Sequence, residues 1–122
     1  MEEIMHIFES ERNILELLWD KGEMTAKEIS DTLAGTVGWN RNTTYTVIKK
    51  CVAKGLVERS EPHFVCRALV SREEARSAEA KSLLDSWFGG SASLFFASLL
   101  DGKDVTEEEI DKLRRQLNRE ED

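Results

Sequence analysis

The chain has 122 residues, enough for one compact domain or for a small domain with a short appendage. Its formal net charge of -7 at pH 7 argues against indiscriminate binding to nucleic acids. Two cysteines are too few for a thiolate metal site or a disulfide framework, so we expect reduced thiols, no metal and no cofactor. An acidic N-terminus and the lack of a run of ~18 apolar residues predict a cytoplasmic protein.

The basic residues are concentrated in one stretch. Residues 1–70 carry nine Lys or Arg and eleven Asp or Glu, a net of -2, and residues 71–122 carry eight and thirteen, a net of -5. Within the first part, residues 36–59 hold five Lys or Arg against one Glu, a local net of +4. A surface that binds nucleic acid is therefore expected in that stretch.

Two helices are predicted before it. Residues 10–20 have a broad apolar face typical of a core helix, ending at Lys21 and Gly22. Thr25 and Glu28 form a capping box that opens a second helix, which we expect to stop at Ala34 and Gly35. In a helix-turn-helix this helix start faces a phosphate, so Thr25 and Lys27 are lesser candidates for DNA contact.

Within residues 40–55, a helix is predicted over 40–54. This helix should have one buried face and one outer face. At about 100° per residue, one side carries Thr44, Val47, Ile48, Cys51 and Val52. The opposite side carries Asn42, Thr46, Lys49 and Ala53, with Thr43 and Lys50 beside them. Short polar side chains followed by cations suit a recognition helix, because the former reach base edges and the latter meet phosphates.

A short hairpin follows the helix. Residues 56–60 and 63–70 are predicted strands, joined by a turn at Glu61 and Pro62. Three helices followed by a hairpin are the order of a winged helix, here with a short wing. His63 beside the turn either touches DNA or is an ordinary exposed loop residue.

The remaining chain is predicted to be helical and to need a partner. A capping box at Ser71 and Glu74 opens a helix that runs to Phe88, where Gly89 and Gly90 break it. An apolar segment then spans 92–100, and a third capping box starts at Thr106. These short helices carry more Leu, Phe and Trp than a tail of this size can hide. We therefore expect a homodimer, with a DNA-binding domain at 1–70 and a helical dimerisation domain at 71–122.

Six segments in order resemble the penicillinase-repressor family of bacterial transcription factors, the BlaI, MecI and CopY group. The resemblance covers nearly the whole chain, and its segments are residues 16–22, 25–29, 42–46, 54–57, 69–74 and 87–91. It implies a mainly α fold, with a winged helix-turn-helix and a C-terminal helical dimerisation arm. It also implies a dimeric repressor that binds double-stranded palindromic operator DNA.

The resemblance also assigns roles to individual residues. Asn42, Thr43 and Tyr45 occupy the positions from which members touch bases and nearby phosphates. Many relatives have a basic residue at the position of Tyr45, which here either contacts DNA or packs on the flank of the helix. We assign the following residues to phosphates or neighbouring base edges: Arg41, Thr46, Lys49, Lys50, and, from the wing strands, Arg59 and Arg67.

The same family implies a dimer core and a mode of release. The expected dimer-core residues are Leu83, Leu84, Trp87, Phe88, Leu94, Phe95, Leu99, Ile110, Leu113 and Leu117. Members that guard beta-lactam resistance are inactivated when a membrane sensor protease triggers cleavage in the arm. The corresponding bond here is Ser98–Leu99, although this chain lacks the Asn before the bond and the Phe after it. Residues 67–122 contain no cysteine, unlike the copper-responsive branch.

Three other functions compete with the repressor. An enzyme is disfavoured, because His6 and His63 lack partners at a catalytic spacing and no glycine-rich phosphate loop occurs. A winged helix that binds proteins without specific DNA binding agrees with the net negative charge, but it does not need a local net of +4. A ligand-sensing repressor of another winged-helix family would need a pocket that the short tail hardly provides.

Overall fold

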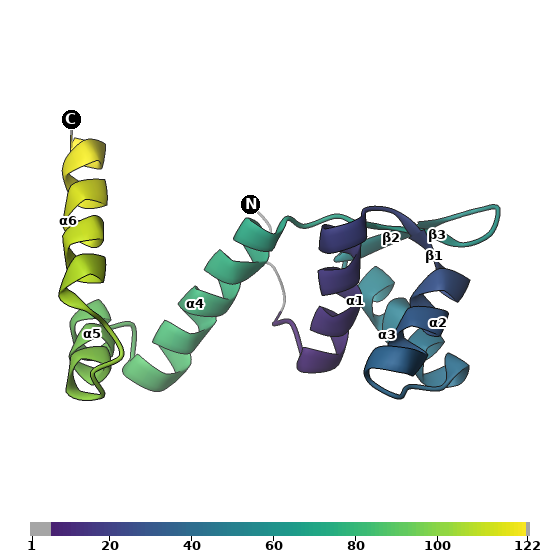
Figure 1. The fold of residues 1–122 in the computed structure, drawn as a ribbon, viewed down its shortest axis with the longest axis horizontal. Helices are drawn as coiled ribbons and strands as arrows, with labels where there is room; N and C mark the ends of the chain where they lie inside the picture. Colours follow the sequence, from purple (N-terminus) through teal and green to yellow (C-terminus); the bar gives the residue numbers. More distant parts are fainter. Residues whose placement is uncertain (1–5, 122) are drawn as a thin grey trace. The chain divides into compact units, whose positions relative to one another are not determined.

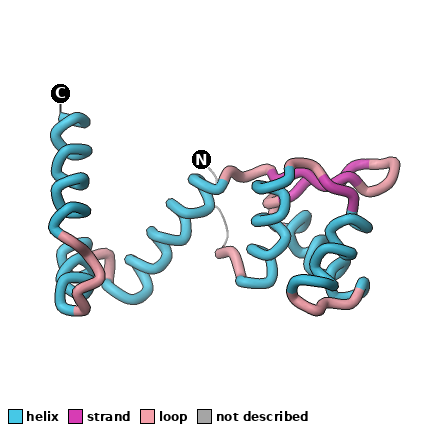
Figure 2. Tube along the Cα trace, in the orientation of Figure 1, coloured by secondary structure: helices cyan, strands magenta, loops and turns pink. Residues whose placement is uncertain are grey.

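The computed structural model describes residues 6–121 (Figure 1), which form two compact units, Met1–Ala80 and Lys81–Asp122. The first unit contains three helices, a three-stranded antiparallel sheet and the start of a fourth helix (Figure 2). Its elements are α1 (Glu9–Lys21), β1 (Met24–Thr25), α2 (Ala26–Thr36), α3 (Arg41–Ala53), β2 (Val57–Ser60) and β3 (Val65–Ala68), followed by α4 (Arg72–Phe88). This is the expected winged helix-turn-helix.

Periodic apolar residues build a single core in this unit. In α1 the buried positions are Glu11, Ile14, Leu15 and Leu18, a spacing of three and four residues that keeps one stripe facing inward. The stripe packs with residues from the other two helices, the sheet and the start of α4. The buried apolar residues are Ile7, Ile14, Leu15, Leu18, Met24, Ala26, Ile29, Leu33, Val47, Ile48, Cys51, Leu56, Val57, Cys66 and Ala75.

The expected end of α2 was wrong by one to two residues. The helix continues through Gly35 to Thr36, and the Val37 N–H still donates to the Leu33 carbonyl at 2.9 Å. A glycine inside a helix only weakens it, by about 1 kcal/mol relative to alanine, so Gly35 alone did not stop it. The chain reverses instead near Gly38, whose φ of 75° favours glycine.

The hairpin differs from the prediction in two respects. His63 and Phe64 have φ values of 70° and 52°, which a strand cannot accommodate, so β3 begins at Val65 and not at His63. It also ends at Ala68 and not at Val70. In addition, Met24 and Thr25 pair with Cys66 and Val65 as a third strand, giving the order β1-β3-β2. Two residues before a capping box carry no strand pattern, and β1 was therefore missed.

Side-chain caps define the ends of the remaining helices, as predicted. The Glu74 N–H donates to the Ser71 hydroxyl and the Ser71 N–H to the Glu74 carboxylate, both at 3.0 Å, at the start of α4. Gly89 and Gly90 have φ values of 54° and 80° and end it. Helix α5 (Ala92–Asp101) is capped by Ser91, and α6 (Glu107–Glu121) follows the third capping box.

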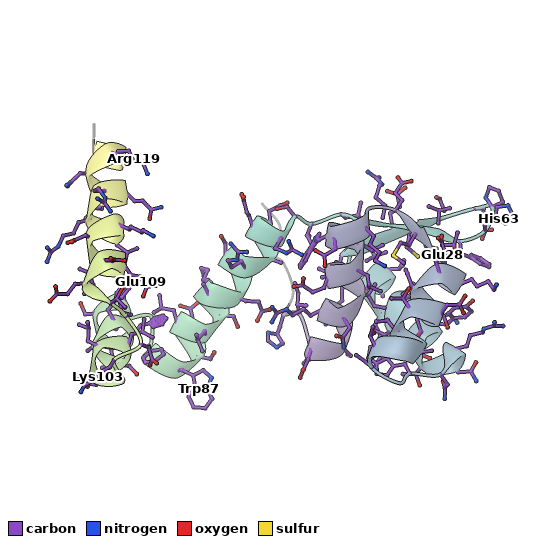
Figure 3. The ribbon with its side chains drawn as sticks, in the orientation of Figure 1. Glu28, His63, Trp87, Lys103, Glu109 and Arg119 are labelled. Carbon is purple, nitrogen blue, oxygen red and sulfur yellow. The ribbon has the colours of Figure 1, made fainter. Side chains whose placement is uncertain are left out.

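The second unit buries none of its described side chains fully. Between residues 81 and 119, every described residue is half-buried or exposed. The exposed fraction is 78% for Trp87, 55% for Leu94, 52% for Leu100 and 59% for Leu117. Trp87 projects from α4 (Figure 3). The apolar surface of this unit is therefore not covered within the described chain.

The boundary between the compact units falls within α4, between Ala80 and Lys81. The predicted boundary between the DNA-binding and dimerisation domains, between residues 70 and 71, precedes that helix and stays a prediction. Among the described residues, no single helix has the length and apolarity of a membrane span. Helices α4 and α5 reach that length and composition only when they are counted together across the bend between them.

Candidate nucleic-acid interface

Helix α3 presents a buried face and an exposed face. Thr44, Val47, Ile48 and Cys51 are buried, as predicted. The exposed face carries the predicted DNA-contacting residues of this helix other than Tyr45, namely Arg41, Asn42, Thr43, Thr46, Lys49 and Lys50. The structure therefore brings these six residues together on one element, with their side chains accessible.

The short polar side chains of this surface have free hydrogen-bonding groups. The side chain of Asn40 accepts a hydrogen bond from the Thr43 N–H at 2.8 Å and so caps the helix. The neighbouring polar side chains are therefore not needed as caps. Within residues 6–121, the side chains of Asn42, Thr43 and Thr46 make no hydrogen bond. Their amide and hydroxyl groups can therefore donate to and accept from base edges.

The cations of the basic stretch divide into two groups. The amine Nζ of Lys54 lies 2.7 Å from the carboxylate Oε1 of Glu11, and its side chain is only 15% exposed. One positive charge of the local net of +4 is thus paired inside the first unit. The other four remain exposed and are the cations of this stretch available to phosphates, namely Arg41, Lys49 and Lys50 on α3 and Arg59 on β2.

Val52 and Tyr45 lie on the flanks of α3, between its buried and exposed faces. Val52 was expected on the buried face but is 37% exposed, because it lies about 90° from the middle of that face. Tyr45 is half-buried and packs against the core. Packing accounts for the ring of Tyr45, while contact of its hydroxyl with DNA stays a prediction.

The start of α2 is largely occupied by its own cap. The Glu28 N–H donates to the Thr25 hydroxyl at 3.1 Å, and the Thr25 N–H donates to the Glu28 carboxylate at 2.9 Å. The hydrogen bond from the backbone of Thr25, and then that from its side chain, lower the pKa of Glu28. An ionised carboxylate here opposes a phosphate, so exposed Lys27 is the better contact candidate of the predicted pair.

The wing supplies two exposed arginines with different surroundings. Arg67 pairs with Glu58 directly across the sheet, which offsets its charge. The guanidinium of Arg59 lies 5.1 Å from the centroid of the Phe64 ring, next to the turn that carries His63 at its tip (Figure 3). Arg59 is therefore the stronger of the two phosphate candidates.

The two cysteines are buried free thiols. Burial, followed by the nearby Glu11 carboxylate, raises the pKa of Cys51 to about 12, and burial raises the pKa of Cys66. Thiols of this kind are poor nucleophiles and poor metal ligands. Among residues 6–121, no cluster of three or more His, Cys, Asp or Glu side chains could hold a metal ion.

The predicted dimer residues fall into two groups. Leu84, Phe88, Phe95, Leu99 and Ile110 are half-buried, and the Phe88 and Phe95 rings are 5.2 Å apart, so these residues pack within the unit. The exposed members are Leu83, Trp87, Leu94, Leu113 and Leu117. Two exposed apolar residues were absent from the predicted set, Phe96 and Leu100.

Comparison with known proteins supports the same reading of the chain. A family model described as "Penicillinase repressor" matches residues 7–119. The chain belongs to the penicillinase repressor family. It is thus a member of a family of DNA-binding transcriptional repressors, and not of an enzyme family.

Individual relatives of this family are distant in sequence. The methicillin resistance regulatory protein MecI of Staphylococcus aureus (strain N315) is 22% identical over 115 residues, covering 93% of this chain and 94% of MecI. The penicillinase repressor of Bacillus licheniformis is 20% identical over 115 residues, covering 93% of this chain and 90% of that repressor. The solved DNA-binding domain of the repressor BlaI matches 61% of this chain and 93% of that domain, with a TM-score of 0.54 and 20% identity, and shows the same fold.

The ion pair between buried Glu11 and partly buried Lys54 was not predicted from the sequence. The signal was present, because Glu11 stands three and four residues before Ile14 and Leu15, on the buried stripe of α1. A carboxylate on a buried stripe needs a hydrogen-bonding or cationic partner. Lys54, at the end of α3, is such a partner.

Proposed function

We propose that this member of the penicillinase repressor family acts as a homodimer on palindromic operator DNA. Each copy would place α3 in a major groove, with half-sites one or more helical turns apart. The observation that carries the proposal is the outer face of α3, where amide and hydroxyl groups that no described residue engages precede exposed lysines.

The two kinds of side chain are expected to do different work. Asn42 and Thr43 lie at the start of α3, where short side chains can reach base edges. Lys49 lies farther along the helix and is exposed, which suits a contact with phosphate. Tyr45, Thr46, Lys50 and Arg41 are expected to support these contacts, and Lys27, Arg59 and Arg67 to add phosphate contacts at the edge.

Dimerisation would supply most of the affinity. Two weak half-site contacts become one tight contact when the second units hold the copies together. The apolar side chains of α4, α5 and α6 that no described residue covers support this role.

Release would follow from damage to the second unit. The Ser98–Leu99 bond lies in the last turn of α5, and the carbonyls of both residues accept hydrogen bonds, from Gly102 at 3.1 Å and from Asp104 at 3.0 Å. A membrane sensor protease, or a protease that it activates, would have to unwind this turn before cutting. Cleavage would separate α6 from the rest of the chain and weaken the dimer.

The test is a salt series of binding to the DNA upstream of the protein's own gene, with a random duplex as control. We expect Lys49→Ala to lower affinity for both duplexes and to reduce the salt slope by about 1. Asn42→Ala and Thr43→Ala should reduce the preference for the upstream DNA. Equal losses on both duplexes for all three variants would contradict these roles, and no preference in the unmodified protein would favour a winged helix that binds proteins.

A further inference from the structure

Residues His6–Phe8, which we name the latch, bring α1, α3 and α4 of the first unit together. Each of the three residues offers a backbone group to a different partner. The His6 carbonyl accepts a hydrogen bond from Lys54 at 2.9 Å, just after α3. The Ile7 N–H donates to Glu79 of α4 at 3.0 Å, and the Phe8 N–H donates to Glu11 of α1 at 2.9 Å.

The centre of this arrangement is an ion pair between the buried Glu11 carboxylate and the partly buried Lys54 amine. Glu11 is 1% exposed, and its Oε1 accepts from both Lys54 and the Phe8 N–H, while its Oε2 has no hydrogen-bond partner among the described residues. Lys54 also lies 4.3 Å from the centroid of the Phe8 ring. A buried carboxylate that depends on one cation tolerates little displacement of that cation.

We infer that Glu11, Lys54 and Glu79 are positioning residues for DNA binding, which hold the C-terminal end of α3 in place through the latch. This inference rests on the proposed function for its effect on DNA. Because Glu79 belongs to α4, the latch joins the recognition helix to the helix that leads to the second unit. A change that pulls Glu79 from Ile7 would loosen Lys54 and the last turn of α3.

The best variant for a test is Glu79→Ala, because the Glu79 side chain is 40% exposed and its loss should not unfold the unit. Glu73→Ala is the matched control, since Glu73 is exposed on the same helix and makes no side-chain hydrogen bond or ion pair within the described range. It removes the same charge and so corrects for weaker repulsion of DNA. Glu79→Gln is the rescue variant, because its amide oxygen can still accept from the Ile7 N–H.

The first measurement is amide hydrogen exchange without DNA. The reporting amides are those of Lys54, Gly55 and Leu56, which bond to the carbonyls of Lys50, Val52 and Cys51 at 3.1, 3.0 and 2.9 Å. We expect Glu79→Ala to speed exchange at these amides about fivefold or more, while Glu73→Ala and Glu79→Gln leave it unchanged. Exchange equal to that of Glu73→Ala would overturn the inference whether or not the protein binds DNA.

The second measurement is the ratio of affinities for upstream and random duplex. We expect Glu79→Ala to lower this ratio about fivefold relative to Glu73→Ala, with recovery in Glu79→Gln. An unchanged ratio together with faster exchange would overturn the link from the latch to DNA recognition. If the unmodified protein prefers neither duplex, the proposed function fails, and the exchange result alone decides whether the latch holds α3.

Discussion

The two compact units of this chain contrast in how they bury apolar side chains. In the first, one core joins α1, α2, α3, the sheet and Ala75 of α4. In the second, the described part of the chain has no fully buried side chain, although α5 is the most apolar helix of the protein. A unit with a complete core can fold alone, whereas one with uncovered Leu, Phe and Trp residues needs another surface.

Under the proposed function, this contrast would separate DNA recognition in the first unit from the gain in affinity that dimerisation through the second unit supplies. From Arg41 to Lys50, the exposed residues of the first unit's α3 are all polar or basic, as expected of a surface that meets DNA. Those of the second are polar residues interspersed with large apolar side chains, as expected of a surface that meets protein. One unit would read the operator, and the other would supply the second copy.

The largest expected effect comes from removing the second unit. We expect residues 1–80 to fold alone, because the core they contain is complete, and to remain monomeric. Affinity for the upstream duplex should fall about 100-fold or more, since avidity is lost. Circular dichroism would check the fold and fluorescence anisotropy the affinity. A fragment that binds as tightly as the full chain would contradict the proposal that the second unit supplies affinity.

A smaller effect should follow from one charge on the uncovered surface. Leu117→Glu places a carboxylate on a residue that is 59% exposed in one chain and that we expect to be covered in the dimer. We expect weaker dimerisation by about 2 kcal/mol or more, roughly 30-fold, measured by sedimentation equilibrium. Gln116→Glu, the adjacent control, adds the same charge beside the apolar stripe and should have little effect. Equal behaviour of the two variants would place the interface elsewhere.

The smallest effect compares equivalent helix caps in the two units. Thr25→Ala and Thr106→Ala each remove a capping-box hydroxyl. Each should cost about 1 kcal/mol. For Thr25 the loss should appear in unfolding of the first unit at every protein concentration, and for Thr106 it should appear as weaker dimerisation. Urea unfolding at two concentrations would distinguish them, and a concentration-dependent loss in Thr25→Ala would contradict the independence of the first unit.

The Thr25 cap also predicts a dependence on pH. Because folding lowers the pKa of Glu28, the capping box stabilises the folded state above the ordinary carboxyl pKa. That contribution should be lost as pH falls through the lowered value. Glu28→Ala removes the titrating carboxylate. In urea unfolding it should therefore differ most from the unmodified protein near neutral pH and least in acid.

Periodicity and capping motifs predicted most of the fold from the sequence. The stripe in α1, the outer face of α3 and the three capping boxes depend on spacing within a few residues, which a sequence displays directly. The strand β1 and the shortened β3 were missed, because pairing of Met24 with Cys66 and the φ values of His63 and Phe64 depend on distant or backbone geometry.

The exposure of the candidate DNA-contacting residues of α3 was predictable from the sequence, but the pairing of charges near them was not. The exposed positions of α3 follow from helix spacing, whereas the pairing of Lys54 with Glu11 joins residues 43 positions apart. Counting charges along the sequence therefore assigned Lys54 to a basic surface, although its amine is paired with the buried Glu11 carboxylate.

The role of the second unit can be tested through the mass of the protein, measured by sedimentation equilibrium alone and with the DNA upstream of its gene. We expect two copies on one duplex, and a dimer in free solution that dissociates on dilution. A single copy bound to the duplex with full preference over random DNA would contradict the claim that the second unit serves to join two chains.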